Sequence, residues 1–257
     1  MNSKIAKADA KHQKIHSQKR KKDNSEKKVG NEIFDELTLK TLYKIANQGH
    51  IAVLNGAIST GKEANVLTGI TDDEKFVAVK IYRIATSDFK KMNYYLDGDP
   101  RFNLKTKNKR KMIYSWVTKE FKNLTRLHDA GVNVPKPITS LNNVLLIEFI
   151  GDKNGNPAQP VKNQPPKNPN EFWEKLLNEL KTFVNDAKLV HGDLSNYNIL
   201  NLNETPVIID VSQSVVLDNP ISKELLERDI NTLINEYSKL GVKTDFNDVW
   251  EYVSPKF

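Results

Sequence analysis

Residues 151–170, GDKNGNPAQPVKNQPPKNPN, divide the chain into two parts of different character. This segment holds five prolines in twenty residues and has no apolar period. Because proline fits neither a helix interior nor a central strand, the segment is expected to be a linker or a surface loop. Strand patterns predominate before it and helical patterns after it. This order predicts an α+β fold of two lobes, with a cleft between them that favours a ligand site.

Hydrophobic periodicity places the elements on both sides of this segment. Three successive strands near the start of the chain are typical of an antiparallel meander. A long helix follows, with Trp116, Val117 and Leu124 on its apolar stripe, and it ends at Gly131. We expect helices over 36–47, 105–130, 171–187 and 221–240, and strands over 51–58, 64–70, 76–82, 137–142, 144–150 and 207–210.

The composition is that of an ordinary soluble globular protein. Of the 257 residues, 38% are hydrophobic and 28% are charged. No apolar run approaches the roughly 20 residues that span a bilayer, and the N-terminus lacks the apolar stretch of a secretory signal. Because the chain has no cysteine, disulfides and thiolate metal sites are excluded. We therefore expect a cytoplasmic protein that does not enter a membrane.

Residues 1–30 carry the entire net charge of the chain. They contain ten Lys or Arg and three acidic residues, which accounts for the +7 of the whole sequence. With few apolar residues to bury, this basic tail is expected to be disordered. It is either a solvated arm that aids solubility or an arm that binds nucleic-acid phosphate by counterion release.

Residues 56–66, GAISTGKEANV, nearly match the phosphate-binding loop G-x-x-x-x-G-K-[ST]. That loop needs a Ser or Thr hydroxyl where this chain has Glu63, and it needs a helix afterwards. The residues that follow Glu63 instead have a strand pattern leading into a turn. The segment is therefore predicted to be a glycine loop between two strands, which would bind phosphate in a different way.

The segment HGDLSNYN contains Asp193 and Asn198, and Asp210 follows it at the end of an apolar strand. This arrangement fits the H-x-D-L-x-x-x-N pattern of phosphoryl transfer, with an acidic metal ligand downstream. Asp193 would orient the attacking hydroxyl or accept its proton. Asn198 and Asp210 would hold Mg²⁺ against nucleotide phosphates, because this hard cation prefers oxygen ligands. The alternative is a polar loop with Asx turns and a capping Asp.

Lys80 follows Ala78 by two residues in a predicted strand, so both side chains share one face. The small residue leaves room for a flat base, and Lys80 could reach the α- and β-phosphates if a carboxylate held it. Glu120 is the candidate, because it falls on the apolar stripe of the long helix, where an unpaired charge is costly. A purely structural salt bridge is the alternative. In LLIEFIG, the backbone groups of Glu148 and Ile150 are expected to bond an adenine edge.

Together these segments resemble the RIO family of atypical serine/threonine protein kinases, and most closely its first subgroup. The segments are ISTGKEANV, VAVKIYR, EFIG, HGDLSNYNIL and IIDVSQ, in the family's order over about residues 35–250. The resemblance implies a reduced bilobal kinase fold, with a β-rich N-lobe, a helical C-lobe and no usual activation segment. It also implies ATP with Mg²⁺ or Mn²⁺, autophosphorylation, and a role in maturation of the small ribosomal subunit. The implied parts are the basic tail 1–30, a family-specific helical segment 31–50, the N-lobe 51–147, and the hinge, linker loop and C-lobe 148–257.

Carried over residue by residue, the resemblance assigns a role to each motif position. Lys80 and Glu120 resemble the ion pair that positions phosphate, and Asp193 resembles the catalytic base. Asn198 and Asp210 resemble the metal ligands, and Asp210 also matches a residue proposed to accept phosphate as an aspartyl-phosphate. ATP binding is therefore expected at Ser59, Thr60, Lys62, Glu63, Lys80, Glu120, Glu148, Ile150 and Ser195.

Three departures from ordinary protein kinases matter for function. Gly192 replaces the Arg that pairs with a phosphorylated activation loop, and Ser195 replaces a phosphate-contacting Lys. No A-P-E segment follows Asp210 before the next predicted helix. Because the usual platform for a peptide substrate is then missing, phosphorylation of diverse proteins is not expected.

Two further segments look family-like. Residues 81–102 resemble the flexible loop of the subgroup, with autophosphorylation expected on a residue such as Ser87. Residues 105–111, KTKNKRK, place positive charge at the start of a helix, which is unfavourable for the helix dipole unless an anion such as RNA phosphate lies near. A solvated basic face is the alternative.

Two rival functions share the same motifs. A small-molecule kinase of the aminoglycoside or choline type also uses an H-G-D-x-x-x-x-N loop, although STGKEANV and the basic tail favour the RIO resemblance. A nucleotide-gated RNA-binding assembly factor would use the ATP site as a conformational timer. The leading expectation is a monomeric ATP-dependent kinase or ATPase that acts on the pre-ribosomal small subunit and binds its rRNA through the basic tail.

Overall fold

The computed structural model describes residues 34–102 and 108–255. The chain divides into two compact units, Met1–Asp35 and Glu36–Phe257. All helices and strands named below belong to the second unit. The predicted basic tail 1–30 and residues 105–107 of the predicted basic run lie outside the described residues. Within the described ranges, no helix is both long enough and apolar enough to cross a bilayer.

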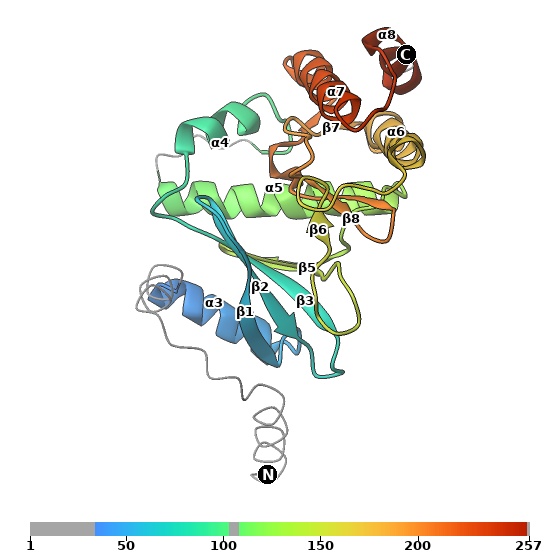
Figure 1. The fold of residues 1–257 in the computed structure, drawn as a ribbon. Coiled ribbons are helices and arrows are strands. Elements are labelled where there is room, and N and C mark those ends of the chain that lie inside the picture. Colours follow the sequence, from blue (N-terminus) through green and yellow to red (C-terminus); the bar gives the residue numbers. More distant parts are fainter. Residues whose placement is uncertain (1–33, 103–107, 256–257) are drawn as a thin grey trace. The chain divides into compact units, whose positions relative to one another are not determined.

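A five-stranded antiparallel sheet forms the first part of the second unit (Figure 1). Its strands are β1 (Val53–Thr60), β2 (Ala64–Ile70), β3 (Phe76–Tyr82), β4 (Pro137–Leu141) and β5 (Val144–Glu148). The spatial order is β1-β2-β3-β5-β4, which puts β3 at the centre, where nearly all of its residues are buried. Lys80 is paired with Val66 of β2 and with Leu145 of β5. The central strand therefore holds Lys80 firmly from both sides.

Three helices accompany the sheet: α3 (Glu36–Asn47), α4 (Phe89–Leu96) and α5 (Lys109–Asp129). α3 is joined to the β4–β5 turn by a hydrogen bond of 2.9 Å from Asn143 Nδ2 to Thr38 Oγ1. The side chain of Asn108 caps the N-terminus of α5 by accepting hydrogen bonds from two backbone amides of its first turn. The chain leaves α5 through Gly131, whose φ of 84° lies in the left-handed region that favours glycine.

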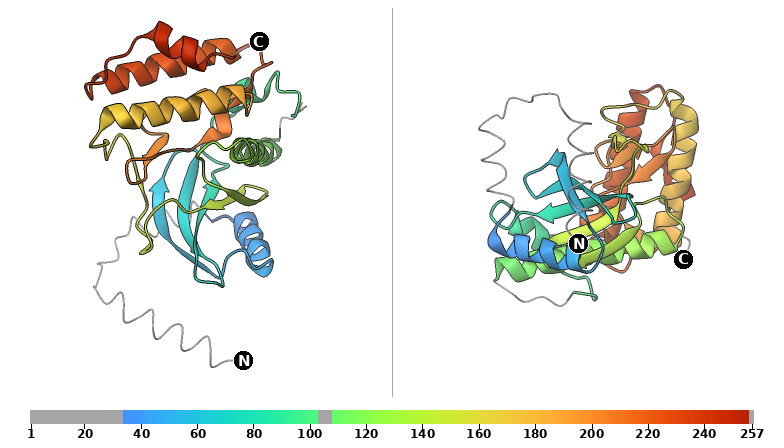
Figure 2. Two further views of the ribbon diagram at one scale, coloured as in Figure 1. Left: turned by 90° about the vertical axis from the view of Figure 1, so that its right-hand side faces the viewer. Right: turned by 90° about the horizontal axis from the view of Figure 1, so that it is seen from below.

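The second part of the unit is mainly helical. α7 (Ser222–Ser238) and α6 (Pro169–Asn185) both pack against the last helix, α8 (Phe246–Val253) (Figure 2). The short strand β6 (Gln159–Pro160) precedes α6. The chain between α6 and α7 forms the short strands β7 (Leu189–Val190), β8 (Ile199–Asn201), β9 (Pro206–Ile208) and β10 (Val215–Val216), and the 3₁₀ turn η1 (Val211–Gln213). One hydrophobic cluster extends from Tyr82 of β3 through Trp116 of α5 to Val253 of α8, so the strand-rich and helix-rich parts share a core.

The predicted α+β class is confirmed, and most predicted elements are present. α3 and the strands β2 and β3 have the predicted bounds. The prediction that 81–102 is a flexible loop is wrong for 89–96, which form α4. Met92, Tyr95 and Leu96 are buried on one face of that helix, and their i, i+3, i+4 spacing was the available signal. The last helix, α8, was also not predicted.

Candidate active site

A cavity of about 670 Å³ is lined by residues from both parts of the fold. They come from the β1–β2 turn, β3, α4, α5, the residues after β5, and the segment between β7 and β10. The predicted site residues that line it are Ser59, Thr60, Lys62, Glu63, Lys80, Glu120, Glu148, Ile150, Asp193, Asn198 and Asp210. The structure therefore brings together nearly all of the predicted site. Ser195 does not line the cavity.

Lys80 is the centre of a charged network in the cavity wall. Its Nζ lies 2.7 Å from Glu120 Oε1 and 3.0 Å from Asp210 Oδ1. Burial of Lys80 alone would lower its pKa, but the charges of Asp210 and Glu120 outweigh that effect and hold the pKa well above its usual range. Lys80 is therefore a permanent cation that links the sheet, the long helix and the segment after β9.

Glu120 is almost completely buried, with 2% of its surface exposed. Both carboxylate oxygens have partners, since Oε1 pairs with Lys80 and Oε2 accepts the hydroxyl proton of Tyr82. The motifs in the sequence did not indicate Tyr82, although it lies two residues beyond Lys80 on the same strand face. Because each oxygen is bonded, the carboxylate of Glu120 holds the ammonium of Lys80 in one position.

The β1–β2 turn forms one wall of the cavity. Gly61 N donates to Ala64 O at 2.9 Å. A Cβ on Gly61 would lie 2.9 Å from that same oxygen, so this tight turn needs glycine. The turn is joined to the residues after β3, because Arg83 N donates to Glu63 O at 2.8 Å and the Thr86 hydroxyl donates to Lys62 O. A strand follows the turn, which confirms that this is a glycine loop between strands and not a P-loop.

Asp193 and Asn198 face the cavity from the loop between β7 and β8. Asp193 Oδ2 accepts a hydrogen bond of 2.6 Å from Gln213 Nε2, and Asn198 Nδ2 donates to the backbone oxygen of Asp193 at 2.8 Å. The donation by its nitrogen leaves the side-chain oxygen of Asn198 as the atom for a ligand. Gln213 is buried, lines the cavity and was missed from the sequence, where no spacing linked it to Asp193.

Buried polar groups fix the backbone of the same loop. Gly192 has a φ of 79°, and its amide donates to Asp229 of α7 at 2.7 Å. The carbonyl of Gly192 accepts from Arg228 of α7 and, at 3.3 Å, from the hydroxyl of Tyr95 on α4. The backbone of Gly192 therefore connects this loop to α4 and α7. In ordinary protein kinases the same position holds an Arg, whose side chain pairs with a phosphorylated activation loop.

Asp210 adopts a left-handed conformation, with a φ of 59°, which is uncommon for a residue other than glycine. Its Oδ1 accepts hydrogen bonds of 3.0 Å from both Lys80 and Ser212. Burial raises the pKa of Asp210, but the charge of Lys80 and these hydrogen bonds lower it by more than burial raises it. The pKa of Asp210 therefore lies below its usual range. The side chain remains 42% exposed toward the cavity. Asp210 is thus an ionised carboxylate that a ligand can reach.

Two side chains of α5 hold the segment that follows Asp210. Lys119 Nζ donates to Ser212 O at 2.9 Å and also to Ser214 O. Asn123 Nδ2 donates to Val211 O at 2.8 Å. Residues 211–221 are all that separates Asp210 from α7, and the prediction that the usual activation segment is absent is confirmed.

The charges in the cavity wall suit a nucleotide only together with a cation. Five carboxylates and three ammonium groups leave two net negative charges, which would repel a triphosphate. Among the described residues, no cluster of three or more His, Cys, Asp or Glu could hold a metal ion by itself. One carboxylate and one amide oxygen, from Asp210 and Asn198, instead suit Mg²⁺, which takes one or two protein ligands and completes its shell with phosphate oxygens and water. The carboxylates are those of Glu63, Glu120, Glu148, Asp193 and Asp210, and the ammonium groups are those of Lys62, Lys80 and Lys91.

The end of β5 and the residues after it also line the cavity. Glu148 N donates to Lys136 O at 2.8 Å, and Ile150 O accepts from Ala158 N at 3.0 Å. The predicted contact with an adenine edge is therefore restricted to the carbonyl of Glu148 and the amide of Ile150. One acceptor and one donor are what the amino and ring-nitrogen edge of adenine requires.

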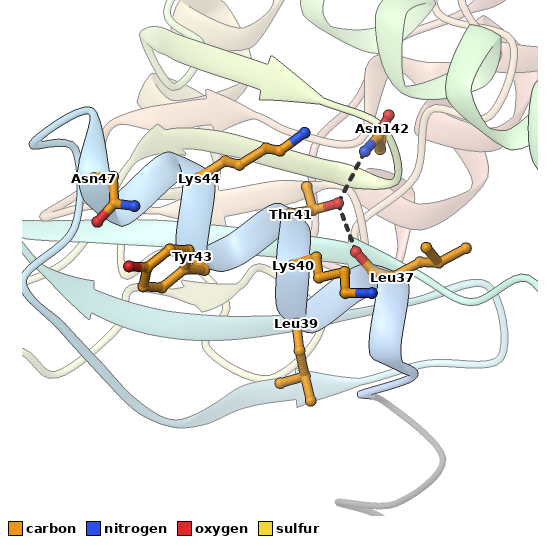
Figure 3. Close-up of a pocket in the computed structure, with 8 residues that line it drawn as sticks. All are labelled: Leu37, Leu39, Lys40, Thr41, Tyr43, Lys44, Asn47 and Asn142. Carbon is orange, nitrogen blue, oxygen red and sulfur yellow. Dashed lines mark hydrogen bonds between the residues drawn. The ribbon is translucent and has the colours of Figure 1, made fainter.

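A second hollow of about 650 Å³ lies over α3 and carries none of this chemistry (Figure 3). Its polar residue Thr41 accepts a bond of 2.9 Å from Asn142 and donates to Leu37 O at 2.8 Å, so its hydroxyl is occupied. Among the eight residues that line it there is no carboxylate, and its two lysines are Lys40 and Lys44. A general base is missing from this hollow, which makes the cavity around Lys80 the candidate site.

A five-stranded sheet with a buried lysine–carboxylate pair, set across a cavity from a helical part, defines a bilobal protein-kinase-like fold. Residues 65–249 match the family model of the RIO domain. A RIO-type serine/threonine-protein kinase Rio1 of Haloferax volcanii is 40% identical over 235 residues, covering 91% of this chain and 80% of the relative. The Homo sapiens serine/threonine-protein kinase RIO1 is 37% identical, covering 91% of this chain and 42% of the relative.

Solved structures agree on the fold. A Rio2 kinase of Chaetomium thermophilum superimposes with a TM-score of 0.64 at 21% identity, covering 83% of this chain and 66% of that chain. An ADP/Mg²⁺-phosphoaspartate complex of that kinase gives a TM-score of 0.61, covering 83% of this chain and 65% of that one. The chain belongs to the RIO family of atypical serine/threonine protein kinases, and its activity is that of a protein kinase.

Proposed function

We propose that this RIO-family kinase uses ATP with Mg²⁺ or Mn²⁺, hydrolyses ATP, phosphorylates itself, and acts in maturation of the small ribosomal subunit. One observation carries the nucleotide part of the proposal. Lys80, Asp193, Asn198 and Asp210, which are far apart in the sequence, line one cavity. The proposal includes a location in the cytoplasm and a monomeric state, both of which rest on the sequence.

The proposed chemistry follows from the placement of these side chains. The ammonium of Lys80 and the donors of the glycine loop bind the phosphates, and Asn198 and Asp210 hold the metal ion, which neutralises phosphate charge when bound. Asp193 orients the acceptor hydroxyl and takes its proton as the new O–P bond forms. The bond from the γ-phosphorus to the β-phosphate oxygen breaks, and ADP leaves.

Asp210 is proposed to act also as a transient acceptor. One of its carboxylate oxygens attacks the γ-phosphorus, ADP leaves, and water then hydrolyses the acyl phosphate to inorganic phosphate and free Asp210. The phosphoaspartate complex described for the Rio2 kinase supports this step by analogy. Both hydrogen bonds to Asp210 from Lys80 and Ser212 go to Oδ1. They would orient the carboxylate during attack by its other oxygen.

The catalytic assignment is tested by Asp193→Asn, which keeps the shape of the side chain. Turnover of γ-labelled ATP with Mg²⁺ should fall by roughly 10²–10⁴-fold, because a positioned general base contributes about that much. Asp72→Asn, in the exposed turn between β2 and β3, is the matched control and should leave turnover unchanged. Full activity of the Asp193 variant would remove Asp193 from the mechanism.

Ribosomal RNA is proposed to bind through residues 1–30, which carry ten basic residues. Each neutralised phosphate adds about 0.9 to the slope of log K against log salt on duplex nucleic acid and about 0.7 on single strands. Deletion of residues 1–30 should therefore flatten this slope by several units for ribosomal RNA. An unchanged slope would show that the tail contributes no phosphate contacts.

A nucleotide-gated assembly factor remains the second candidate, because it needs the same residues. It differs only in the fate of the phosphate. The label of γ-labelled ATP, followed in the presence of pre-ribosomal particles, separates the two: transfer to protein supports the kinase role, and release only as inorganic phosphate supports the timer. No feature of the cavity favours a small-molecule kinase over the family to which the chain belongs.

A further inference from the structure

The catalytic loop of this kinase offers no cation to the transferred phosphate. Its residues 193–198 are Asp-Leu-Ser-Asn-Tyr-Asn, and Ser195, at the position of the lysine of ordinary kinases, lies outside the cavity lining. Lys80 is already engaged with Glu120 at 2.7 Å and with Asp210 at 3.0 Å. Phosphoryl transfer spreads negative charge over the terminal phosphate, and cations around that phosphate stabilise the transition state. The metal ion and the two other ammonium groups of the cavity wall, those of Lys62 and Lys91, are then the positive charges that could meet this phosphate.

Lys91 is in a position to do so. It lies in the first half of α4 and lines the same cavity as Lys80, Asp193 and Asp210, although α4 belongs to neither the glycine loop nor the catalytic loop. Burial raises the pKa of Glu63 in the glycine loop, and the charge of Lys91 is the strongest influence opposing that rise. The ammonium of Lys91 is thus close enough to act on the wall that would cover the phosphates.

α4 is anchored on both sides of the cavity. Thr86, just before the helix, donates to Lys62 O in the glycine loop. At the other end of the helix, Tyr95 donates to Gly192 O of the catalytic loop at 3.3 Å, and Asp97 O accepts from Asn219 at 3.2 Å. Figure 1 shows α4 beside one end of α5, which it contacts. A lysine on such a helix has a defined position relative to both loops.

The start of α4 sets the direction of Lys91. Asp88 caps the helix by accepting hydrogen bonds from Lys90 N at 3.0 Å and from Lys91 N at 3.1 Å. Because successive side chains of a helix point about 100° apart, the buried face of Met92 and Tyr95 leaves Lys90 and Lys91 pointing in different directions. Both side chains are exposed, but only Lys91 lines the cavity.

We propose that Lys91 contacts the γ-phosphate of bound ATP and takes the role of the lysine that ordinary kinases carry in their catalytic loop. The proposal rests on the proposed use of ATP and adds a residue to it. It also gives α4 a function, because the helix would bring a phosphate-binding cation to the site when it docks between the two loops.

Nucleotide affinity separates this role from a structural one. Binding of ADP and of a non-hydrolysable ATP analogue, each with Mg²⁺, is measured by calorimetry for wild type, Lys91→Met and Lys90→Met. Lys91→Met should weaken the analogue about tenfold or more, since hydrogen bonds to charged groups contribute roughly 1.5–3 kcal/mol, and should leave ADP affinity unchanged. Lys90→Met is the matched control and should bind both ligands like wild type. Lys91→Arg should recover part of the lost affinity.

The outcomes are distinct. Equal affinity of wild type and Lys91→Met for the analogue would overturn the proposal, and so would an equal loss for ADP and analogue. Unchanged ADP affinity in Lys91→Met also shows that the variant is folded. If wild type binds neither nucleotide, the proposed function fails, and the Lys91 assignment fails with it.

Discussion

Lys119 is a buried amine without a carboxylate partner among the described residues. Its Nζ donates to the backbone oxygens of Ser212 and Ser214, and none of its surface is exposed. Burial lowers the pKa of Lys119 to about 7, although the charge of Asp99 opposes the shift. The neighbouring Glu120 supports Lys80, so two consecutive residues of α5 hold β3, which carries Lys80, and the segment that follows Asp210.

This buried amine should give the stability a characteristic pH dependence. The unfolded pKa of lysine is about 10.4, so between pH 7 and 9 the unfolded state binds more protons than the folded state. The free energy of unfolding should therefore rise with pH, by about 2 kcal/mol over this interval. In Lys119→Met this contribution should vanish. Urea unfolding at pH 7 and pH 9 tests it, and an identical rise in the variant would exclude Lys119 as its source.

Gln213 contributes to the site through the hydrogen bond of 2.6 Å from its Nε2 to Asp193. Gln213→Leu should lower kcat by roughly 10- to 100-fold, because a hydrogen bond to a charged group contributes about 1.5–3 kcal/mol. The KM for ATP should stay unchanged, since the bond orients the base and not the nucleotide. Gln164→Leu, at an exposed position, serves as control. A raised KM with an unchanged kcat would contradict a positioning role.

At the scale of elements, α4 contributes Lys91 to the cavity wall. Its buried residues Met92, Tyr95 and Leu96 attach it to the core. Ser87, the expected autophosphorylation site, is only 7% exposed and donates its hydroxyl proton to Arg83 O. Phosphorylation of Ser87 would therefore require the start of this segment to open. The residue that receives phosphate stays a prediction.

Weakening the attachment of α4 should loosen it without unfolding the rest. Met92→Ala removes a side chain that is 1% exposed, and such deletions cost about 2–5 kcal/mol. Amide hydrogen exchange should become faster throughout α4 and remain slow in α6, which α4 does not support. Met112→Ala, in the buried face of α5, is the comparison for a general loss of stability. Equal acceleration in α4 and α6 would show that α4 does not open independently.

At the scale of the molecule, the strand-rich and helix-rich parts should unfold together. A single cluster of buried apolar residues extends from β3 to α8. A ligand that binds the cavity between the two parts then stabilises the whole unit, by about 2.7 kcal/mol when present at 100 times its Kd. Binding and cooperative unfolding are linked for this reason.

Thermal unfolding should accordingly show one transition for residues 36–257. ATP with Mg²⁺ at 100 times its Kd should raise Tm by roughly 5–10 °C, given about 2–4 °C per kcal/mol for a unit of this size. Removal of Mg²⁺ with EDTA should abolish most of the shift, because the cavity wall is net negative. Asp210→Asn should lose the Mg²⁺ dependence. Two separate transitions, or a full shift without Mg²⁺, would contradict this account.

Many of the helices and strands, and most residues of the candidate site, could be predicted from the sequence alone. Hydrophobic periodicity predicted α3, β2 and β3, because it depends only on residues that are near one another in the chain. The order of the motifs from Lys80 to Asp210 predicted a kinase-like site, because the chemistry requires particular residue types at particular spacings. What only the tertiary structure decided were the contacts between distant segments: Gln213 on Asp193, and α4 with Lys91 beside the glycine loop. No sequence spacing encodes them, since they arise from packing of a shared core, and the same packing leaves Ser195 outside the cavity.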